Sequence, residues 1–196
     1  MNSLFPPELN LPEGFFYQPA FISRQEEEML VNRVQEAPLH AMQFQGYEAK
    51  RKVMTYGFDW SFEKRSLSKG IPLPPHFHFL IERVAACVGI PMVKFAELLL
   101  TEYPVGSVIK WHRDAPPFEM VAGISLGSPC NFRFRPQDPA KQNRKSIISL
   151  NIEPCSLYIM QGPSRWEWQH STTPVKEVRY SITLRTLKEN VIAPVD

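Results

Sequence analysis

The residues that decide the fold begin with the apolar stretch FAELLL (residues 95–100) and end with RYSITLR (residues 179–185). Between them, short apolar and aromatic stretches alternate with turn residues such as Gly106, Gly127 and Gly162. This spacing is typical of many short strands packed as a sandwich or a jelly-roll barrel. We therefore expect strands over residues 95–102, 108–114, 122–126, 131–135, 146–152, 157–161 and 177–185.

Two helices are expected ahead of these strands, so the predicted fold class is mostly β with flanking helices (α+β). Ser23 and Glu26 form a capping-box pattern, apolar residues follow at helical spacing, and Pro38 ends the run. A second helix is expected to begin near Pro74 and to end at Gly89. The other N-terminal segments are expected to be extended (1–22) or irregular (39–72).

Composition argues against a membrane-spanning protein and against a disulfide-bonded or zinc-stabilised fold. The 196 residues are 43% hydrophobic and 21% charged, which is ordinary for a chain that buries a core. No apolar run approaches the roughly 20 residues of a membrane span. The 3 cysteines lie far apart and one is necessarily unpaired, which argues against a disulfide framework or a structural zinc site. Because no signal peptide is visible, we expect a cytoplasmic monomer without membrane association.

His112 and Asp114 form the first candidate for a metal site. They lie two residues apart in a predicted strand, so their side chains are expected on the same face. Such a pair occurs by chance in many proteins, and His170 is the candidate third ligand. Two histidines and one carboxylate occupy one face of Fe(II) and leave positions open for a co-substrate and O₂. The absence of neighbouring thiolates favours iron over zinc.

The predicted strand over residues 179–185 has one polar and one apolar face. Its odd-numbered residues are Arg, Ser, Thr and Arg, and its even-numbered residues are Tyr, Ile and Leu. The polar face could meet solvent, but its position shortly after His170 favours a polar face that points inward. Because arginine pairs with carboxylates and keeps its charge, inward Arg179 and Arg185 suit a small dicarboxylate. Iron chelated by a 2-oxo acid, with arginine on the distal carboxylate, is the chemistry of a 2-oxoglutarate dioxygenase.

Three motifs, in this order along the chain, resemble those of the AlkB-type dioxygenases. They are YPVGSVIKWHRD (103–114), SRWEWQHS (164–171) and RYSITLR (179–185). The resemblance covers roughly residues 10–188 and implies a double-stranded β-helix, which is a jelly roll. Because no internal repeat and no dividing linker is visible, we expect one domain over residues 1–196. Within it, residues 1–94 would form an N-terminal helical and substrate-lid extension, and residues 95–188 the jelly-roll core.

The resemblance also implies a role for each residue of the site. The implied Fe(II) ligands, which are also the catalytic residues, are His112, Asp114 and His170. Arg179 is expected to pair with the distal carboxylate of 2-oxoglutarate, assisted by the hydroxyl of Tyr103. Arg185 is expected near the oxo-acid end of the co-substrate and near the substrate. The chain departs from the family pattern at Thr101 and Ser181, where relatives often have asparagine.

Two basic segments are candidates for contact with nucleic acid. In residues 50–65, basic side chains interleave with Tyr56, Trp60 and other aromatic residues, which suits a single strand or a flipped base. The resemblance places this segment at the substrate lid, and the alternative is a half-buried strand. Arg133 opens a second basic segment, suited to phosphate contact or simply a solvated loop. Lys110 is expected at the mouth of the site or at an exposed strand end.

Together these patterns predict an enzyme that oxidatively demethylates N-alkylated bases of single-stranded DNA or RNA, as in the repair of alkylation damage. It would use Fe(II), 2-oxoglutarate and O₂ and release succinate, CO₂ and formaldehyde. One alternative is the same oxygenase chemistry on a tRNA modification, a protein side chain or a small molecule. Another is a catalytically inactive jelly-roll binding module, against which the intact set of predicted ligands and arginines argues.

Overall fold

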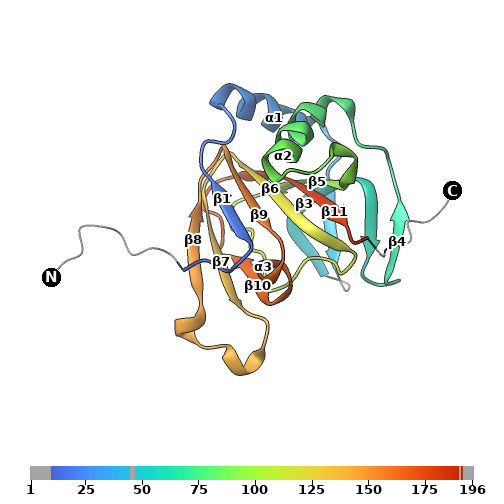
Figure 1. Cartoon of the computed structure of the whole chain (residues 1–196). Coiled ribbons are helices and arrows are strands. Elements are labelled where there is room, and N and C mark those ends of the chain that lie inside the picture. The colour runs from blue at the N-terminus through green and yellow to red at the C-terminus, as the bar shows by residue number, and fades with distance from the viewer. Residues whose placement is uncertain (1–9, 45–46, 190, 192–196) are drawn as a thin grey trace.

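The computed structural model describes residues 10–44, 47–189 and 191, which fold into two antiparallel sheets (Figure 1). The larger sheet has the strand order β1-β9-β6-β11-β5-β3-β2, and β4 pairs with β3 beside this path. Its strands are β1 (Phe15–Gln18), β2 (His40–Phe44), β3 (Tyr47–Ser61), β4 (Ser66–Lys69), β5 (Phe95–Tyr103), β6 (Phe118–Leu126), β9 (Ser156–Met160) and β11 (Arg179–Leu187). The smaller sheet has the order β10-β7-β8 and consists of β7 (Cys130–Pro136), β8 (Ile148–Ile152) and β10 (Trp168–Thr172).

The two sheets face each other across an apolar core. Tyr103, Val121 and Tyr158 from the larger sheet pack there with Phe132 and Phe134 from the smaller one. Two facing antiparallel sheets connected in this way form a jelly roll, so the predicted fold class is confirmed.

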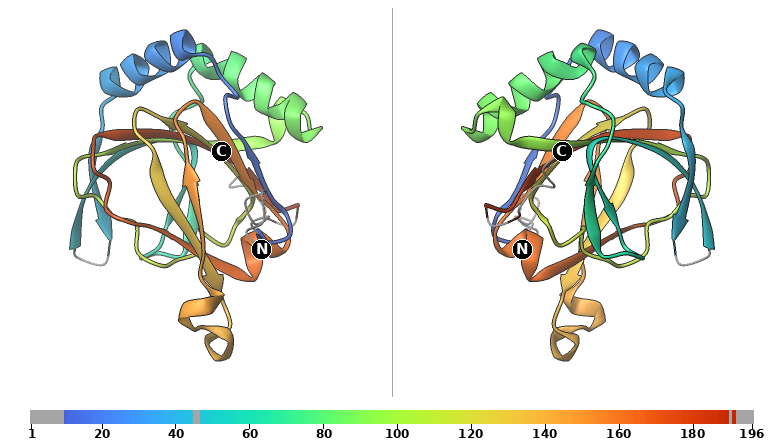
Figure 2. Two further views of the ribbon diagram at one scale, coloured as in Figure 1. Left: turned by 90° about the vertical axis from the view of Figure 1, so that its left-hand side faces the viewer. Right: turned by 90° about the vertical axis from the view of Figure 1, so that its right-hand side faces the viewer.

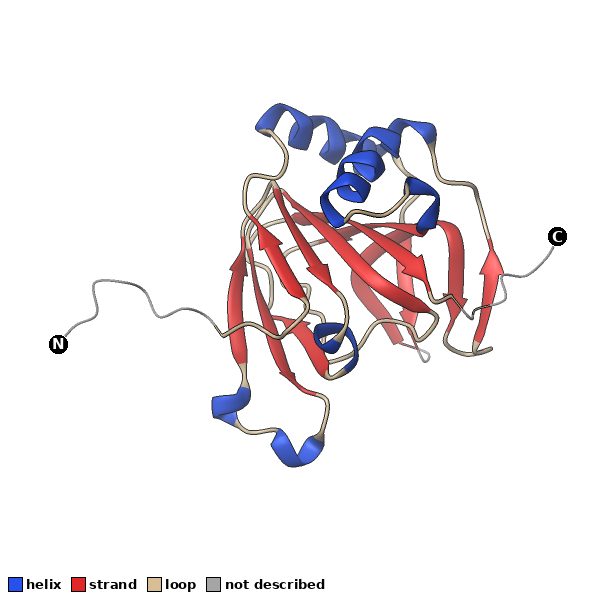
Figure 3. Cartoon of the chain, in the orientation of Figure 1, coloured by secondary structure: helices blue, strands red, loops and turns tan. Residues whose placement is uncertain are grey.

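Two helices cover the outer side of the larger sheet: α1 (Arg24–Glu36) and α2 (His78–Val88) (Figure 2). The predicted capping box is present, with the side chain of Ser23 accepting from the Glu26 amide and Glu26 accepting from the Ser23 amide. Gly89 ends α2 in the left-handed conformation that glycine adopts readily. Shorter helical segments, shown with the strands in Figure 3, are η1 (Pro75–Phe77), η2 (Met92–Lys94), η3 (Pro139–Lys141), η4 (Arg144–Ser146) and α3 (Pro163–Trp166).

Strand β11 separates the core under the helices from the space between the sheets. Its apolar residues Ile182 and Leu184 pack with the helices. Its polar face points the other way and is also buried, with Arg179 only 3% exposed and Ser181 1% exposed. The expectation of an inward polar face is therefore confirmed, and the alternative of a solvent-facing strand is wrong.

Several sequence-based predictions of local structure are wrong. Residues 108–114 form a loop alongside β10 and not a strand, joined to β10 by the bridge between His112 and His170 and by a hydrogen bond from the Thr172 amide to the Ile109 carbonyl. Residues 39–72 are not irregular but form β2, β3 and β4. Residues 10–22 agree with the extended segment expected there and include β1, which forms the edge of the larger sheet beside β9, whereas residues 1–9 lie outside the described part of the chain. His170 lies within β10, a strand that the periodicity did not predict.

Strands on both sides of the predicted division at residues 94 and 95 belong to the same sheet, since β3 pairs with β5. The assignment of one domain with an N-terminal lid remains a prediction. Across the described part of the chain, no helix has the length and apolar character that a membrane crossing requires.

Candidate metal centre and co-substrate pocket

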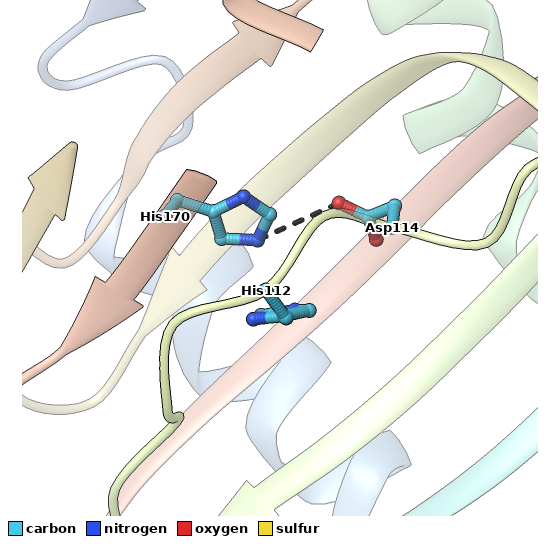
Figure 4. A group of neighbouring side chains, drawn as sticks. All are labelled: His112, Asp114 and His170. Carbon is cyan, nitrogen blue, oxygen red and sulfur yellow. Dashed lines mark ion pairs between the residues drawn. The ribbon is translucent and has the colours of Figure 1, made fainter. Parts of the chain in front are cut away.

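Three side chains from the loop before β6 and from β10 lie close together (Figure 4): His112, Asp114 and His170. The potential ligand atoms of the three residues all lie within 4.8 Å of one another. His112 and His170 are fixed as a bridged pair, because each backbone amide donates to the other's carbonyl, at 3.1 and 2.9 Å. The backbone thus places a loop residue and a strand residue side by side.

Asp114 is held in one orientation by Arg185. Its Oδ1 accepts from Nε and Nη2 of Arg185 at 3.1 and 2.6 Å. Its Oδ2 is buried without a hydrogen bond in the described structure and lies 3.5 Å from Nε2 of His170. Burial alone would raise the pKa of Asp114, but Arg185, His170, Arg165 and His112 hold this pKa far below its usual range. The carboxylate is therefore ionised, with one oxygen left for a cation.

The two imidazoles are neutral and oriented for a metal ion. Burial lowers the pKa of His112, and burial together with His112 lowers the pKa of His170 to about 3. Nδ1 of His112 lies 2.8 Å from the carbonyl oxygen of Lys110, which holds the ring and directs Nε2 toward the site. The ring of His170 stacks on Phe132 at a centroid distance of 5.3 Å. Two neutral imidazoles and a carboxylate with an unpartnered oxygen fit an Fe(II) ion that keeps open positions.

Arg179 lies deeper between the sheets and lacks an acidic partner among the described residues. Its Nη2 donates to Oγ of Ser125 at 3.1 Å, and its Nε is buried without a hydrogen bond. Its guanidinium lies 4.9 Å from the centre of the Tyr103 ring, and the Tyr103 hydroxyl is 3.3 Å from Oγ of Ser181. A buried cation with so little compensation suits an anionic ligand. The structure thus brings Arg179 and Tyr103 together, as the sequence predicted.

The predicted substrate residues are not gathered in one place. Tyr56 packs against the core beneath the helices, on the face of the sheet opposite the metal centre, because it shares the face of Leu98. Trp60 lies on the ribbon that β3 forms with β4. Lys110 is exposed, and its carbonyl oxygen contacts His112.

Arg133 lies on β7, where its Nε donates to Oγ of Ser171 at 3.1 Å. Its guanidinium also lies 5.0 Å from the centre of the Trp111 ring. Trp111 directly precedes His112, but Arg133 lies opposite Ser171, on the face of the smaller sheet that alternates with the face of His170. Among the predicted substrate residues, Lys110 contacts a proposed ligand through its backbone.

Two residues near the site, Arg165 and Glu97, were not predicted from the sequence. Nη2 of Arg165 donates to the carbonyl oxygens of Asp114, Ala115 and Phe118 at 3.1, 2.7 and 3.0 Å, and so shapes the loop that carries Asp114. Glu97 forms an ion pair with Arg185. A charged residue inside the apolar run FAELLL was the available signal for Glu97.

Comparisons with known proteins agree with this geometry. A family model described as the 2OG-Fe(II) oxygenase superfamily matches residues 14–185. The tRNA (carboxymethyluridine(34)-5-O)-methyltransferase alkbh8 of Xenopus tropicalis is 27% identical over 172 residues, which are 85% of this chain and 26% of that protein. The protein of the same name from Mus musculus is 28% identical over 172 residues, 85% of this chain and 25% of that protein. The chain thus spans about a quarter of the length of these relatives.

Solved structures show the same fold at low sequence identity. The structure of OsALKBH1 matches with a TM-score of 0.72 and 14% identity, covering 88% of this chain and 96% of that one. A prolyl-4-hydroxylase of Pseudomonas putida matches with a TM-score of 0.61 and 12% identity, covering 89% of this chain and 93% of that one.

Proposed function

Because the chain belongs to the 2OG-Fe(II) oxygenase superfamily and is of the AlkB type, we propose that it oxidises alkyl groups on nitrogen atoms of nucleic-acid bases. The enzyme class, Fe(II) as cofactor, and 2-oxoglutarate and O₂ as co-substrates agree with the sequence-based predictions. The substrate, the roles of the individual residues and the release of formaldehyde are the proposed part.

In this proposal, one group of residues binds the metal ion and another binds the co-substrate. His112, Asp114 and His170 hold Fe(II) on one face. Arg179 binds the distal carboxylate of 2-oxoglutarate, for which its free Nε and the nearby Tyr103 hydroxyl are available. Arg185, predicted near the oxo-acid end, has its guanidinium occupied by Asp114 and Glu97, so its main role is to orient Asp114.

When bound, Fe(II) with 2-oxoglutarate and O₂ supplies an oxidant that hydroxylates a C–H bond and leaves succinate and CO₂. A methyl group hydroxylated next to nitrogen loses formaldehyde, and the nitrogen regains a hydrogen. The described residues provide placement of that bond and exclusion of water from the space between the sheets.

The observation that carries the nucleic-acid substrate is a stack of side chains on the smaller sheet, on the face opposite to the one that His170 and Phe134 share. The guanidiniums of Arg133 and Arg135 lie 5.0 and 4.7 Å from the centre of the Trp111 ring, and Trp111 precedes the ligand His112. Guanidinium groups contact phosphates, and aromatic rings stack on bases. The β7–β8 connection projects beyond the sheets and carries further exposed basic residues, including Lys141 (Figure 2). This arrangement supports a single-stranded substrate that crosses the smaller sheet.

A second candidate is oxidation of a tRNA modification, which the names of the relatives favour, since both are tRNA methyltransferases. The two candidates share the site and differ in substrate. Methylated single-stranded DNA, methylated single-stranded RNA and bulk tRNA would each be incubated with the Fe(II)-loaded protein and 2-oxoglutarate. Nucleosides would then be analysed by mass spectrometry.

Loss of a methyl group together with formaldehyde release supports the first proposal. A retained hydroxyl group on a tRNA nucleoside supports the second. If no nucleoside changes while the protein still oxidises 2-oxoglutarate, both are wrong, and a protein or small-molecule substrate becomes the next hypothesis. His112→Ala is the matched control, because it removes a proposed ligand without opening a large cavity in the core.

A further inference from the structure

Glu97 is a buried carboxylate to which the proposed reaction assigns no role. It lies on β5 directly opposite Arg185 on β11, and it is only 3% exposed. Its Oε2 forms an ion pair with Nη1 of Arg185. Ionised carboxylates are almost never this deeply buried without a specific partner. The partner here is the arginine that also holds Asp114.

The guanidinium of Arg185 joins two carboxylates. Nη1 contacts Glu97, whereas Nε and Nη2 both donate to Oδ1 of Asp114. Because a guanidinium is planar and rigid, the contact with Glu97 sets the plane in which Asp114 is held. That plane leaves Oδ2 of Asp114 without a hydrogen bond and 3.5 Å from Nε2 of His170. A change at Glu97 therefore reaches the ligand oxygen through a single intervening side chain.

Glu97 also changes how strongly Arg185 competes with a metal ion for the negative charge of Asp114. Around the site the described structure places two poorly exposed carboxylates, Glu97 and Asp114, and three guanidiniums, those of Arg165, Arg179 and Arg185. Among these five groups positive charge is in excess, while the carboxylates of Glu119 and Asp59 act on Arg165 and on Glu97 respectively. If Glu97 were neutral, Arg185 would interact with Asp114 alone and would oppose the binding of a divalent cation more strongly.

We propose that Glu97 is a positioning residue of the metal centre, which holds Arg185 so that Asp114 presents Oδ2 to the metal and keeps its charge available to it. This inference rests on the proposed function, specifically on His112, Asp114 and His170 as the ligands. Glu97 touches neither the metal nor the substrate in this scheme. It acts through Arg185.

Metal affinity tests this role without any turnover. Titration calorimetry with Mn(II), a redox-stable substitute for Fe(II), would compare wild type with Glu97→Gln. We expect metal binding about 10- to 100-fold weaker, the usual effect of removing a partner of a ligand. Glu102→Gln is the matched control, because Glu102 lies on the same strand and pairs with the exposed side chain of Lys52 at 2.9 Å. We expect the control variant to bind Mn(II) like wild type.

A double-mutant cycle separates a role through Arg185 from a general effect on the fold. If Glu97 acts through Arg185, Glu97→Gln should weaken Mn(II) binding by no more than a few-fold in an Arg185→Gln background. An equal loss in both backgrounds would overturn the proposal. The visible absorption spectrum of bound Co(II) gives a second readout, and we expect it to shift in Glu97→Gln and not in Glu102→Gln.

The outcomes also separate this inference from the proposed function. Wild-type affinity in folded Glu97→Gln would overturn the role of Glu97 and leave the ligand assignment intact. Failure of wild type to bind Mn(II), or unchanged binding in His112→Ala, would overturn the ligand assignment and this inference with it. If Glu97→Gln does not fold, the same Mn(II) titration would be carried out with Glu97→Asp. This variant keeps the charge and shortens the reach, and unchanged Mn(II) affinity in it would equally refute the role.

Discussion

The two arginines on the inner face of β11 should respond to the same substitution with opposite changes in stability. Arg179 donates a hydrogen bond to Ser125, contacts Tyr103 and has no acidic partner among the described residues. Arg185 is paired with the two carboxylates of Glu97 and Asp114. Replacing each with methionine removes the charge and keeps most of the side-chain length. The comparison therefore isolates the effect of the partners.

For Arg179→Met without ligands, the substitution removes a desolvation cost of several kcal/mol for a buried ion. It also removes about 2 kcal/mol from the hydrogen bond to Ser125 and about 1 kcal/mol from the contact with the Tyr103 ring. We expect a net gain of about 1–2 kcal/mol in the free energy of unfolding. For Arg185→Met we expect a loss of about 3 kcal/mol, because two buried carboxylates would be left without their partner.

The assay is urea unfolding of the metal-free proteins, followed by titration of the metal-loaded proteins with 2-oxoglutarate. Arg179→Met should bind 2-oxoglutarate at least ~100-fold more weakly, because two charge-assisted hydrogen bonds are lost. Arg33→Met, on the exposed face of α1, is the control and should change stability by less than ~0.5 kcal/mol. If Arg179→Met loses as much stability as Arg185→Met, then Arg179 is compensated within the fold and its assignment as an anion-binding residue is wrong.

Three further outcomes follow from the structure. His112→Ala should abolish 2-oxoglutarate oxidation and leave the circular dichroism spectrum unchanged, and residual oxidation would contradict its role as a ligand. Gly123→Ala should lower the free energy of unfolding by about 1–3 kcal/mol, because the added carbon would lie 2.1 Å from the ring of Tyr158; urea unfolding that matches wild type would contradict this packing. Hydrogen bonds from Arg83 and from the capping-box amide of Ser23 lower the pKa of Glu26 to about 2, below the ordinary 4.5 of an unfolded chain. Its carboxylate therefore stabilises the fold fully above about pH 4.5, and this contribution is lost as the pH falls through about 2. Glu26→Gln should cost about 1 kcal/mol at pH 7 and progressively less toward pH 2, as measured by unfolding at several pH values.

Much of the site was predictable because its chemistry depends on residue types at short spacing. The alternation in RYSITLR placed both arginines on one face, and the structure confirms that this face points inward. The pair of His112 and Asp114 was predicted for the wrong local reason. The two residues lie in a loop, yet their side chains still converge, because Arg185 holds Asp114 and the backbone of His170 holds His112.

Other features depend on contacts between distant segments. The strand that carries His170 is defined by its pairing with β7, and its own periodicity does not predict it. The ribbon in residues 39–72 exists because β3 finds a partner in β5, far along the chain. Tyr56 shows the same limit, since alternation offered a half-buried strand as an alternative there but did not indicate which face of that strand meets the helices.

The sequence by itself determined the helix caps, the two-faced strand at residues 179–185 and the set of candidate ligands. These features depend on interactions between residues that are close together along the chain. Only the tertiary structure decided that Glu97 faces Arg185 across β5 and β11, and that Arg165 holds the carbonyl groups around Asp114. These contacts join residues from separate strands and loops. They supply the partners that buried charged groups require, and no pattern along a single segment specifies which residues those partners are.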